Sequence, residues 1–237
     1  LLKNELSIFP KQENAVELKD VRKYFLHDID TYKVVFVDGK YSSFLSQTTH
    51  DGVDICLLSA ALSKDKYLPV IENYFNKVAP NDGMSSLNTA FAREGAYLYI
   101  PKHKEVEKPV EIINFYTGVE TDLMLQPRNL IVVEENAHVQ IIERHQSLSS
   151  NAVLTNSVTE IFVGARAHVD YYKIQNDQKE ASLIDNTYIK QERDSIASVH
   201  TFSFGGKLTR NNLNFYQHGE HASSVMNGIT LIEDTQH

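Results

Sequence analysis

Two histidines of this chain occupy equivalent places in a repeated pattern, thirty residues apart. His138 lies in the segment ENAHVQII and His168 in the segment ARAHVDYY. If the two segments lie on neighbouring strands, the imidazoles stack about 4.8 Å apart and can share one metal ion. A metal site in a protein usually has three or four ligands, and the repeat supplies only two. We therefore expect both rings to face solvent or a partner instead. Failure of the purified protein to bind zinc or iron in a calorimeter would remove the metal alternative.

Four acidic residues offer a second kind of chemistry, because a solenoid can carry paired carboxylates for glycosidic hydrolysis on one face. They are Glu134, Glu135, Glu160 and Asp170. A solvated polar face is the alternative, and we favour it because the chain has no tryptophan, whose broad ring commonly stacks on sugars. A carbohydrate-active enzyme therefore stays the alternative to a non-catalytic protein.

The single cysteine, Cys56, lies in the apolar run DICLL. A metal–sulfur cluster normally takes four thiolates, so this thiol is expected to be a small core side chain rather than a cluster ligand or a nucleophile. Gly205, Gly206 and Gly219 are expected to form turns between strands rather than a phosphate-binding loop. Since the usual phosphate-loop, dinucleotide and nucleophile motifs do not occur, we assign no catalytic residue and no metal or cofactor ligand.

The repeated segments predict the elements that position these residues. A third copy, ASVHTF, begins at Ala197 after another thirty residues, so that Val139 is paired with Val169 and Val199. Within each copy, aliphatic and polar residues alternate, which is the period of a strand with one buried face. A repeat at fixed spacing indicates stacked units that cannot bury their apolar faces alone. The chain is therefore predicted to be a β-solenoid.

Two further patterns agree with stacked strands. The same offset aligns Gln140 with Asp170 and His200, and it places Glu143 beside Lys173, so that these two can pair between neighbouring strands. All six prolines precede residue 128, and central strands of a sheet exclude proline.

The N-terminal part predicts a different organisation. Residues 33–41 read as a hairpin, because Asp38 and Gly39 stand between β-branched or aromatic runs. Residues 67–78 and 86–94 read as helices and residues 96–100 as a strand. We expect residues 1–86 to form a smaller mixed α/β region and residues 87–237 to form the solenoid core.

Composition narrows the classes of partner. The chain has 237 residues, 42% of them hydrophobic, and a formal charge of −8 with scattered basic residues, which disfavours nucleic acid and anionic membranes. One cysteine and the lack of a signal peptide or a long apolar run indicate the cytoplasm. The missing initial methionine and the end at His237 suggest a trimmed chain.

Several linked segments resemble the SufB/SufD family. They are LNTAFAREGAYLYIPK at 87–102, KPVEI at 108–112, RNLIVV at 128–133, IERH at 142–145, GGKLTRNNL at 205–213, GEHA at 219–222, NG at 227–228 and DTQH at 234–237. The NTAF segment, the mixed region before it and the single cysteine are more similar to SufD than to SufB. The resemblance implies a mainly β protein built on a right-handed parallel β-helix, which agrees with the repeat.

The resemblance also implies a scaffold subunit for iron–sulfur cluster assembly rather than an enzyme. In that family SufD pairs with SufB through the β-helices, the cluster forms at their interface, and both recruit the ATPase SufC through C-terminal helices. Those helices and a segment similar to Cys-Ser-His-Gly are expected beyond His237, so no cluster ligand is carried over to this chain. A generic solenoid binding module stays open as another alternative. The exposed edge of the last turn predicts pairing with another chain, including a homodimer.

Overall fold

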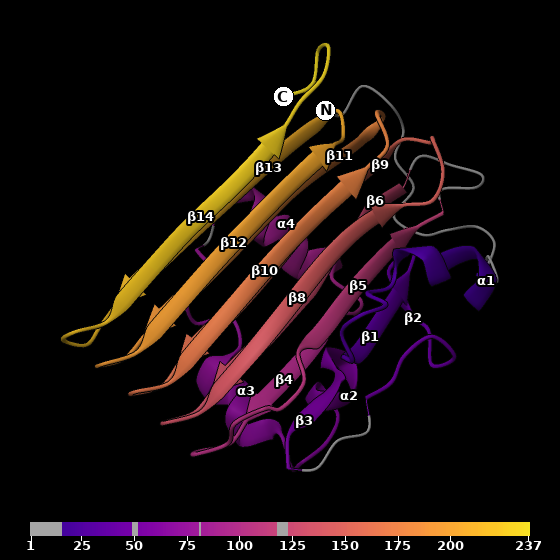
Figure 1. The fold of residues 1–237 in the computed structure, drawn as a ribbon. Coiled ribbons are helices and arrows are strands. Elements are labelled where there is room, and N and C mark those ends of the chain that lie inside the picture. The colour runs from indigo at the N-terminus through magenta and orange to yellow at the C-terminus, as the bar shows by residue number, and fades with distance from the viewer. Residues whose placement is uncertain (1–15, 49–51, 81, 118–122) are drawn as a thin grey trace.

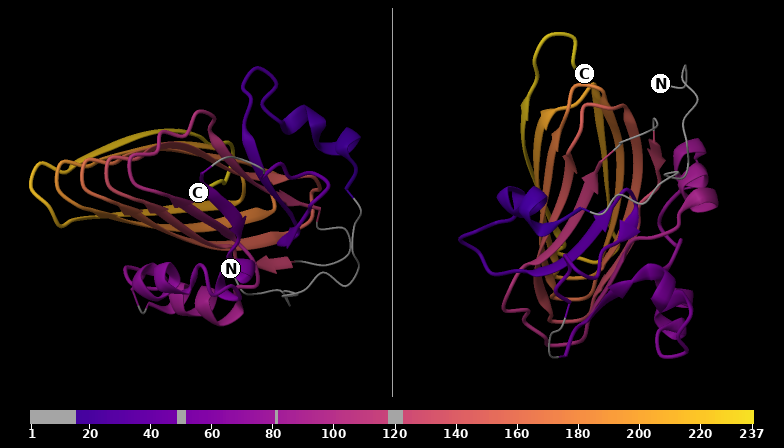
Figure 2. Two further views of the ribbon diagram at one scale, coloured as in Figure 1. Left: turned by 90° about the horizontal axis from the view of Figure 1, so that it is seen from below. Right: turned by 90° about the vertical axis from the view of Figure 1, so that its right-hand side faces the viewer.

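Two seven-stranded sheets face each other and are joined strand by strand into a parallel β-solenoid of about four turns. The computed structural model describes residues 16–48, 52–80, 82–117 and 123–237. Figure 1 shows β8, β10, β12 and β14 side by side in the nearer sheet, and Figure 2 shows how the two sheets close into a flattened tube. This architecture confirms the predicted mainly β solenoid.

Each turn of the solenoid contributes one strand to each sheet. The strands are β7 (Arg128–Val133), β8 (His138–Ser147), β9 (Val153–Val163), β10 (His168–Asp177), β11 (Ala181–Gln191), β12 (Ile196–Gly205), β13 (Leu208–Gln217) and β14 (Ser223–Leu231). Among these eight strands, neighbours within each sheet run parallel. Gly205 and Gly206, at the link between β12 and β13, have positive φ of 70° and 76°, which suits glycine in a turn.

The register confirms the first repeat and corrects the second. His138 pairs with His168, as the thirty-residue offset predicts, but Val169 pairs with Ala197 rather than with Val199. The link between β8 and β9 spans residues 148–152, whereas the link between β10 and β11 spans residues 178–180 and is two residues shorter. Because a shift of two residues keeps every side chain on the same face of its strand, the core pattern survives while the predicted partner is wrong.

The same shift changes the predicted polar rows. Asp170 pairs with Gln140, as expected, and on its other side with Ser198 rather than His200. Lys173 pairs with Glu143, also as expected, and its other neighbour is Thr201.

The interior of the solenoid is apolar at one end of the strands. Val139, Ile141, Ile161, Val163 and Val169 are buried there in one hydrophobic cluster. Burying such a side chain is worth about 1.5–3 kcal/mol, so this cluster is a main source of stability.

The N-terminal part extends both sheets. Strands β1 (Tyr32–Val37) and β2 (Lys40–Tyr41) form the predicted hairpin, in which Asp38 and Gly39 have positive φ of 48° and 75°. Strand β1 pairs in parallel with β5 (Val110–Tyr116), and β3 (Asp54–Leu57) pairs antiparallel with β4 (Ala96–Ile100), the predicted strand. The short β6 (Leu123–Leu125) pairs with β9.

Helices cover the outside of one sheet. They are α2 (Leu58–Leu62), α3 (Leu68–Tyr74) and α4 (Gly83–Phe91), whereas α1 (Leu18–Val21) and a 3₁₀ helix (Arg22–Tyr24) lie near β1 and β5. Figure 2 shows the purple helices gathered against one face of the tube. The predicted helix 67–78 ends at Tyr74, since Phe75 is extended and Asn76 has φ of 59°. The predicted helix 86–94 instead begins at Gly83, because the Asp82 carboxylate caps it by accepting from Ser85 N at 2.8 Å.

Candidate functional site

A cluster of His138, His168 and Asp170, here called the His–His–Asp cluster, lies on the outer face of the sheet that contains β8 and β10. The two imidazole rings stack with centroids 4.6 Å apart and an interplanar angle of 9°. His168 Nε2 lies 3.1 Å from Asp170 Oδ1, and His138 Nε2 lies 3.4 Å from Asp170 Oδ2. The predicted stacking of the two histidines is therefore confirmed, and the structure adds a carboxylate between them.

The strands explain why these three side chains meet. Residues two apart on one strand share a face, so Asp170 points to the same side as His168. Parallel pairing of β8 and β10 brings His138 level with His168. The sequence signal for the third member is the spacing His-x-Asp in β10, which places Asp170 on the same face of the strand as His168. Two nitrogens and an oxygen are suitable ligands for a metal ion.

A second polar cluster lies inside the solenoid, and from the sequence only the register of its Glu143 and Lys173 is predicted. Along β8 the inward side chains change from aliphatic residues to Glu143 and His145, which are 0% and 3% exposed. The Tyr171 hydroxyl donates to Glu143, whose other oxygen accepts from Asn129 Nδ2 at 3.1 Å. The period of two that places Val139 inward also places residues 143 and 145 inward, and this was the available signal.

Lys173 completes this buried polar cluster from the neighbouring strand. Its ammonium lies 2.5 Å from Asp185 Oδ2 and donates to Thr187 Oγ1 at 2.6 Å. The expected register of Lys173 with Glu143 holds, but the ion pair of Lys173 is formed with Asp185 across the interior. Side chains of both charge signs thus lie close together inside the tube.

The charge states of Glu143 and His145 depend on each other. Burial alone would raise the pKa of Glu143, but the adjacent His145, followed by the charge of Lys173, lowers it to about 2. Burial would lower the pKa of His145, whereas Glu143 and Asp185 raise it. His145 Nε2 lies 3.5 Å from Glu143 Oε1, an ion-pair distance, and its Nδ1 lies 2.5 Å from the hydroxyl of Tyr116.

Glu160, one of the predicted surface carboxylates, is completely buried and structural. It lies 2.6 Å from Arg128 Nη2, and both side chains are at most 1% exposed. Its two oxygens also accept from the backbone N–H groups of Asn76, Val78 and Ala79 at 2.8, 3.0 and 3.2 Å. Glu160 therefore fastens the segment after α3 to the solenoid.

The other three carboxylates have separate partners. Glu135 pairs with Arg166 and lies 3.5 Å from Lys102 Nζ. Glu134 lies near Tyr74, whose pKa is raised by burial and by the charge of Glu134. Asp170 belongs to the His–His–Asp cluster. Glycosidic hydrolysis needs two carboxyl groups on either side of a sugar cleft, and the contacts of these residues support structural roles instead.

Cys56 lies in β3 and is half-buried beside the helices α2 and α3. Its strand position is opposite Tyr97, and it packs against the cluster that contains Leu58 and Leu130. Burial raises the pKa of the thiol, which disfavours the reactive thiolate. These contacts support the expected core role.

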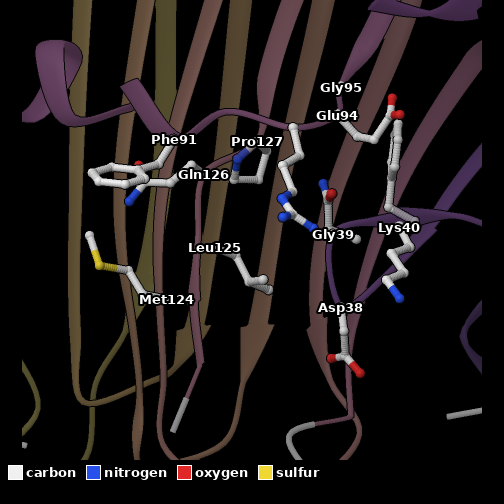
Figure 3. A pocket seen from close by; sticks show the side chains of 13 residues that line it. Asp38, Gly39, Lys40, Phe91, Glu94, Gly95, Met124, Leu125, Gln126 and Pro127 are labelled. Carbon is white, nitrogen blue, oxygen red and sulfur yellow. The ribbon is translucent and has the colours of Figure 1, made fainter. Parts of the chain in front are cut away.

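A small pocket lies where the β1–β2 hairpin meets the end of α4, the chain that follows α4, and β6 with the residues after it. Figure 3 shows Phe91 and Asp38 on opposite sides of it, with Leu125 between them. Its volume is about 40 Å³, which holds about one water molecule, whereas pockets for drug-sized ligands measure roughly 300–1,000 Å³. The pocket does not suit a sugar or a nucleotide.

The family model described as "SUF system FeS cluster assembly, SufBD core domain" matches residues 115–237, which include every strand from β7 to β14. The chain belongs to the SufBD family. A second model, for the SufBD N-terminal region, matches residues 7–112. The resemblance drawn from the sequence segments is thereby confirmed.

Curated relatives place this SufBD protein near SufD. An iron–sulfur cluster assembly SufBD family protein of Synechocystis is 28% identical over 232 residues, which cover 94% of this chain and 51% of that protein. SufD of Escherichia coli is 22% identical over 233 residues, covering 94% and 49%. SufD of Bacillus subtilis is 25% identical over 162 residues, covering 65% and 37%. The chain is SufD-like and spans about half or less of the length of these relatives.

Among the helices in the described parts of this SufBD protein, none has the length and apolar character needed to cross a membrane.

Proposed function

We propose that this chain is a non-catalytic scaffold subunit of the SUF iron–sulfur cluster assembly machinery. It would work in the cytoplasm with a SufB-like paralogue and a SufC-like ATPase. The observation that carries the proposal is the match of the SufBD core model over the whole solenoid, together with relatives that are named SufD.

The contacts of the polar residues support a scaffold. Glu160 fixes a loop, Glu143 and Lys173 belong to the buried polar cluster, and burial raises the pKa of the Cys56 thiol. The hollow near the hairpin admits about one water molecule. A stiff hydrogen-bonded tube of this kind suits a protein that positions partners.

The last turn supports pairing with another β-helix protein. Within the described residues, β13 and β14 are the final strands of the two sheets, and Figure 1 shows β14 along the outer edge. Met226, Ile229 and Leu231 of β14 are 63%, 54% and 63% exposed. An open edge with apolar side chains can accept a further strand, whether from a continuation of a longer chain, from a SufB-like partner or from a second copy of this chain.

A pull-down with edge variants tests the pairing. Met226→Lys places a charge on β14, and Phe44→Lys is the matched control because Phe44 is 76% exposed far along the sequence from β14. We expect the unchanged chain and Phe44→Lys to retain a SufB-like partner, and Met226→Lys to retain much less. Equal capture by all three proteins would remove the edge from the proposed interface, and no capture by any of them would contradict the proposed pairing of this chain.

A further inference from the structure

We propose that the His–His–Asp cluster binds a divalent transition-metal ion, of the zinc or ferrous type, on the outer face of the solenoid. The residues are His138, His168 and Asp170, whose three ligand atoms lie within 4.8 Å of one another. The site is independent of the scaffold role: it needs no partner protein, and its failure would leave the family assignment unchanged.

The spacing of the ligand atoms carries the argument. Zinc binds nitrogen and oxygen at about 2.0–2.2 Å, so two ligands of one ion lie roughly 3.0–3.5 Å apart. The distance from His168 Nε2 to Asp170 Oδ1 is 3.1 Å, and from His138 Nε2 to Asp170 Oδ2 it is 3.4 Å. Both nitrogen–oxygen distances fall in this range, and they end on the two different oxygens of Asp170, so the carboxylate would hold the ion through both oxygens or turn to present one of them.

The stacked rings need one adjustment. Two parallel imidazoles do not direct their nitrogens at one point, so each ring must tilt about its side-chain bonds. His138 and His168 have side chains that are 36% and 37% exposed, which leaves room for this tilt. Asp170, at 16% exposed, is the less mobile centre of the cluster.

The backbone beneath the cluster is held in place. Strand β10 pairs along its length with β8 on one side and β12 on the other, so the Cα positions of all three ligands are fixed by ladder hydrogen bonds. Gln140 stands beside Asp170 on the same face, and Glu105 stands beside His138 through an isolated bridge. A preorganised set of this kind loses little entropy when an ion binds.

The ligand chemistry selects the class of ion. Imidazole nitrogens suit zinc and iron, whereas calcium and magnesium prefer an all-oxygen set. Three protein ligands leave at least one position of the ion open to water, which is typical of exchangeable rather than structural sites. We therefore expect reversible binding of Zn²⁺ and of Fe²⁺.

Calorimetry on the metal-free chain without a polyhistidine tag tests the site. ZnCl₂ is titrated aerobically and Fe²⁺ anaerobically into the unchanged protein and into His138→Gln, His168→Gln and Asp170→Asn. We expect one stoichiometric site in the unchanged protein and a loss of affinity of at least tenfold in each variant. Loss of a mere supporting contact already costs about 10–100-fold at metal sites.

His200→Gln is the matched control. His200 lies on the neighbouring strand β12 of the same sheet and stacks on Tyr172 at 4.9 Å, so it reports binding to any exposed imidazole. It should bind like the unchanged protein. Circular dichroism checks the fold of every variant, and the shift of individual imidazole NMR signals on adding Zn²⁺ gives a second readout. No binding by the unchanged protein, or equal binding by the three cluster variants, would overturn the proposal.

Discussion

Replacement of Glu160 by glutamine tests whether the buried Arg128–Glu160 pair holds the N-terminal part on the solenoid. Glu160→Gln keeps the shape of the side chain but leaves the Arg128 charge unpaired at 1% exposure. Breaking a buried ion pair on one side costs about 3–5 kcal/mol. For a chain of this size that corresponds to a fall in Tm of roughly 6–20 °C.

The structure also predicts an asymmetry between the two partners. Arg128→Met should cost less than Glu160→Gln, because Glu160 keeps three backbone N–H donors when the guanidinium is removed. Two Arg128 nitrogens, Nε and Nη1, have no hydrogen-bond partner, so removing the guanidinium breaks few hydrogen bonds. The free energy of unfolding is measured by urea denaturation followed by circular dichroism.

A second readout follows the segment that Glu160 holds. Lys77 lies between Asn76 and Val78, so tryptic cleavage after Lys77 should quicken in Glu160→Gln. Glu135→Gln is the control, because its pair with Arg166 is exposed and should leave both readouts nearly unchanged. A loss below about 1 kcal/mol in Glu160→Gln with unchanged cleavage would refute the reasoning.

Three further outcomes are expected. Gly95→Ala should destabilise the chain by about 1–3 kcal/mol in urea denaturation, because the new Cβ would lie 1.7 Å from a backbone oxygen, whereas Gly83→Ala meets nothing within 4 Å and should be tolerated; equal losses would argue against the close packing. The pKa of Glu143, lowered to about 2 from 4.5 chiefly by His145 against the effect of burial, gives stability that is present above pH 4.5 and is lost as the pH falls towards 2. The difference in unfolding free energy between the unchanged chain and Glu143→Gln should therefore become smaller as the pH falls from 4.5 towards 2. A difference that stays constant over this range would contradict the proposed role of the Glu143 charge. If the exposed edge makes the chain dimeric, Met226→Lys should shift light scattering towards the monomer mass, and a strict monomer before substitution would count against self-association.

The strands could be predicted because their burial follows a period of two. The alternation around Val139 and Val169 identified buried faces, and the identical histidines fixed the first register. The register around Ala197 could not be predicted in the same way, because the shortened link before β11 changes the offset by an even number and leaves the alternation unchanged. The division of the chain at residues 86 and 87 stays a prediction.

The polar residues were harder to place than the strands. Sequence indicates which face of a strand Glu143 occupies, but its low pKa arises from His145, Lys173 and Tyr171 brought together by folding. Glu160 reads as one more acidic residue, and its role depends on Arg128 and on a loop more than eighty residues earlier in the chain. Contacts of this kind come from tertiary structure and have no local sequence signal.

The mass of the purified assembly tests the scaffold account most directly. This chain, and a version extended to the length of its SufD relatives, would each be mixed with a SufB-like paralogue and a SufC-like ATPase and analysed by chromatography with light scattering. The account predicts one particle that contains all three proteins with the extended version, and loss of the ATPase with this chain. If the extended version elutes alone in the presence of both partners, the proposed role as a SUF scaffold subunit is contradicted.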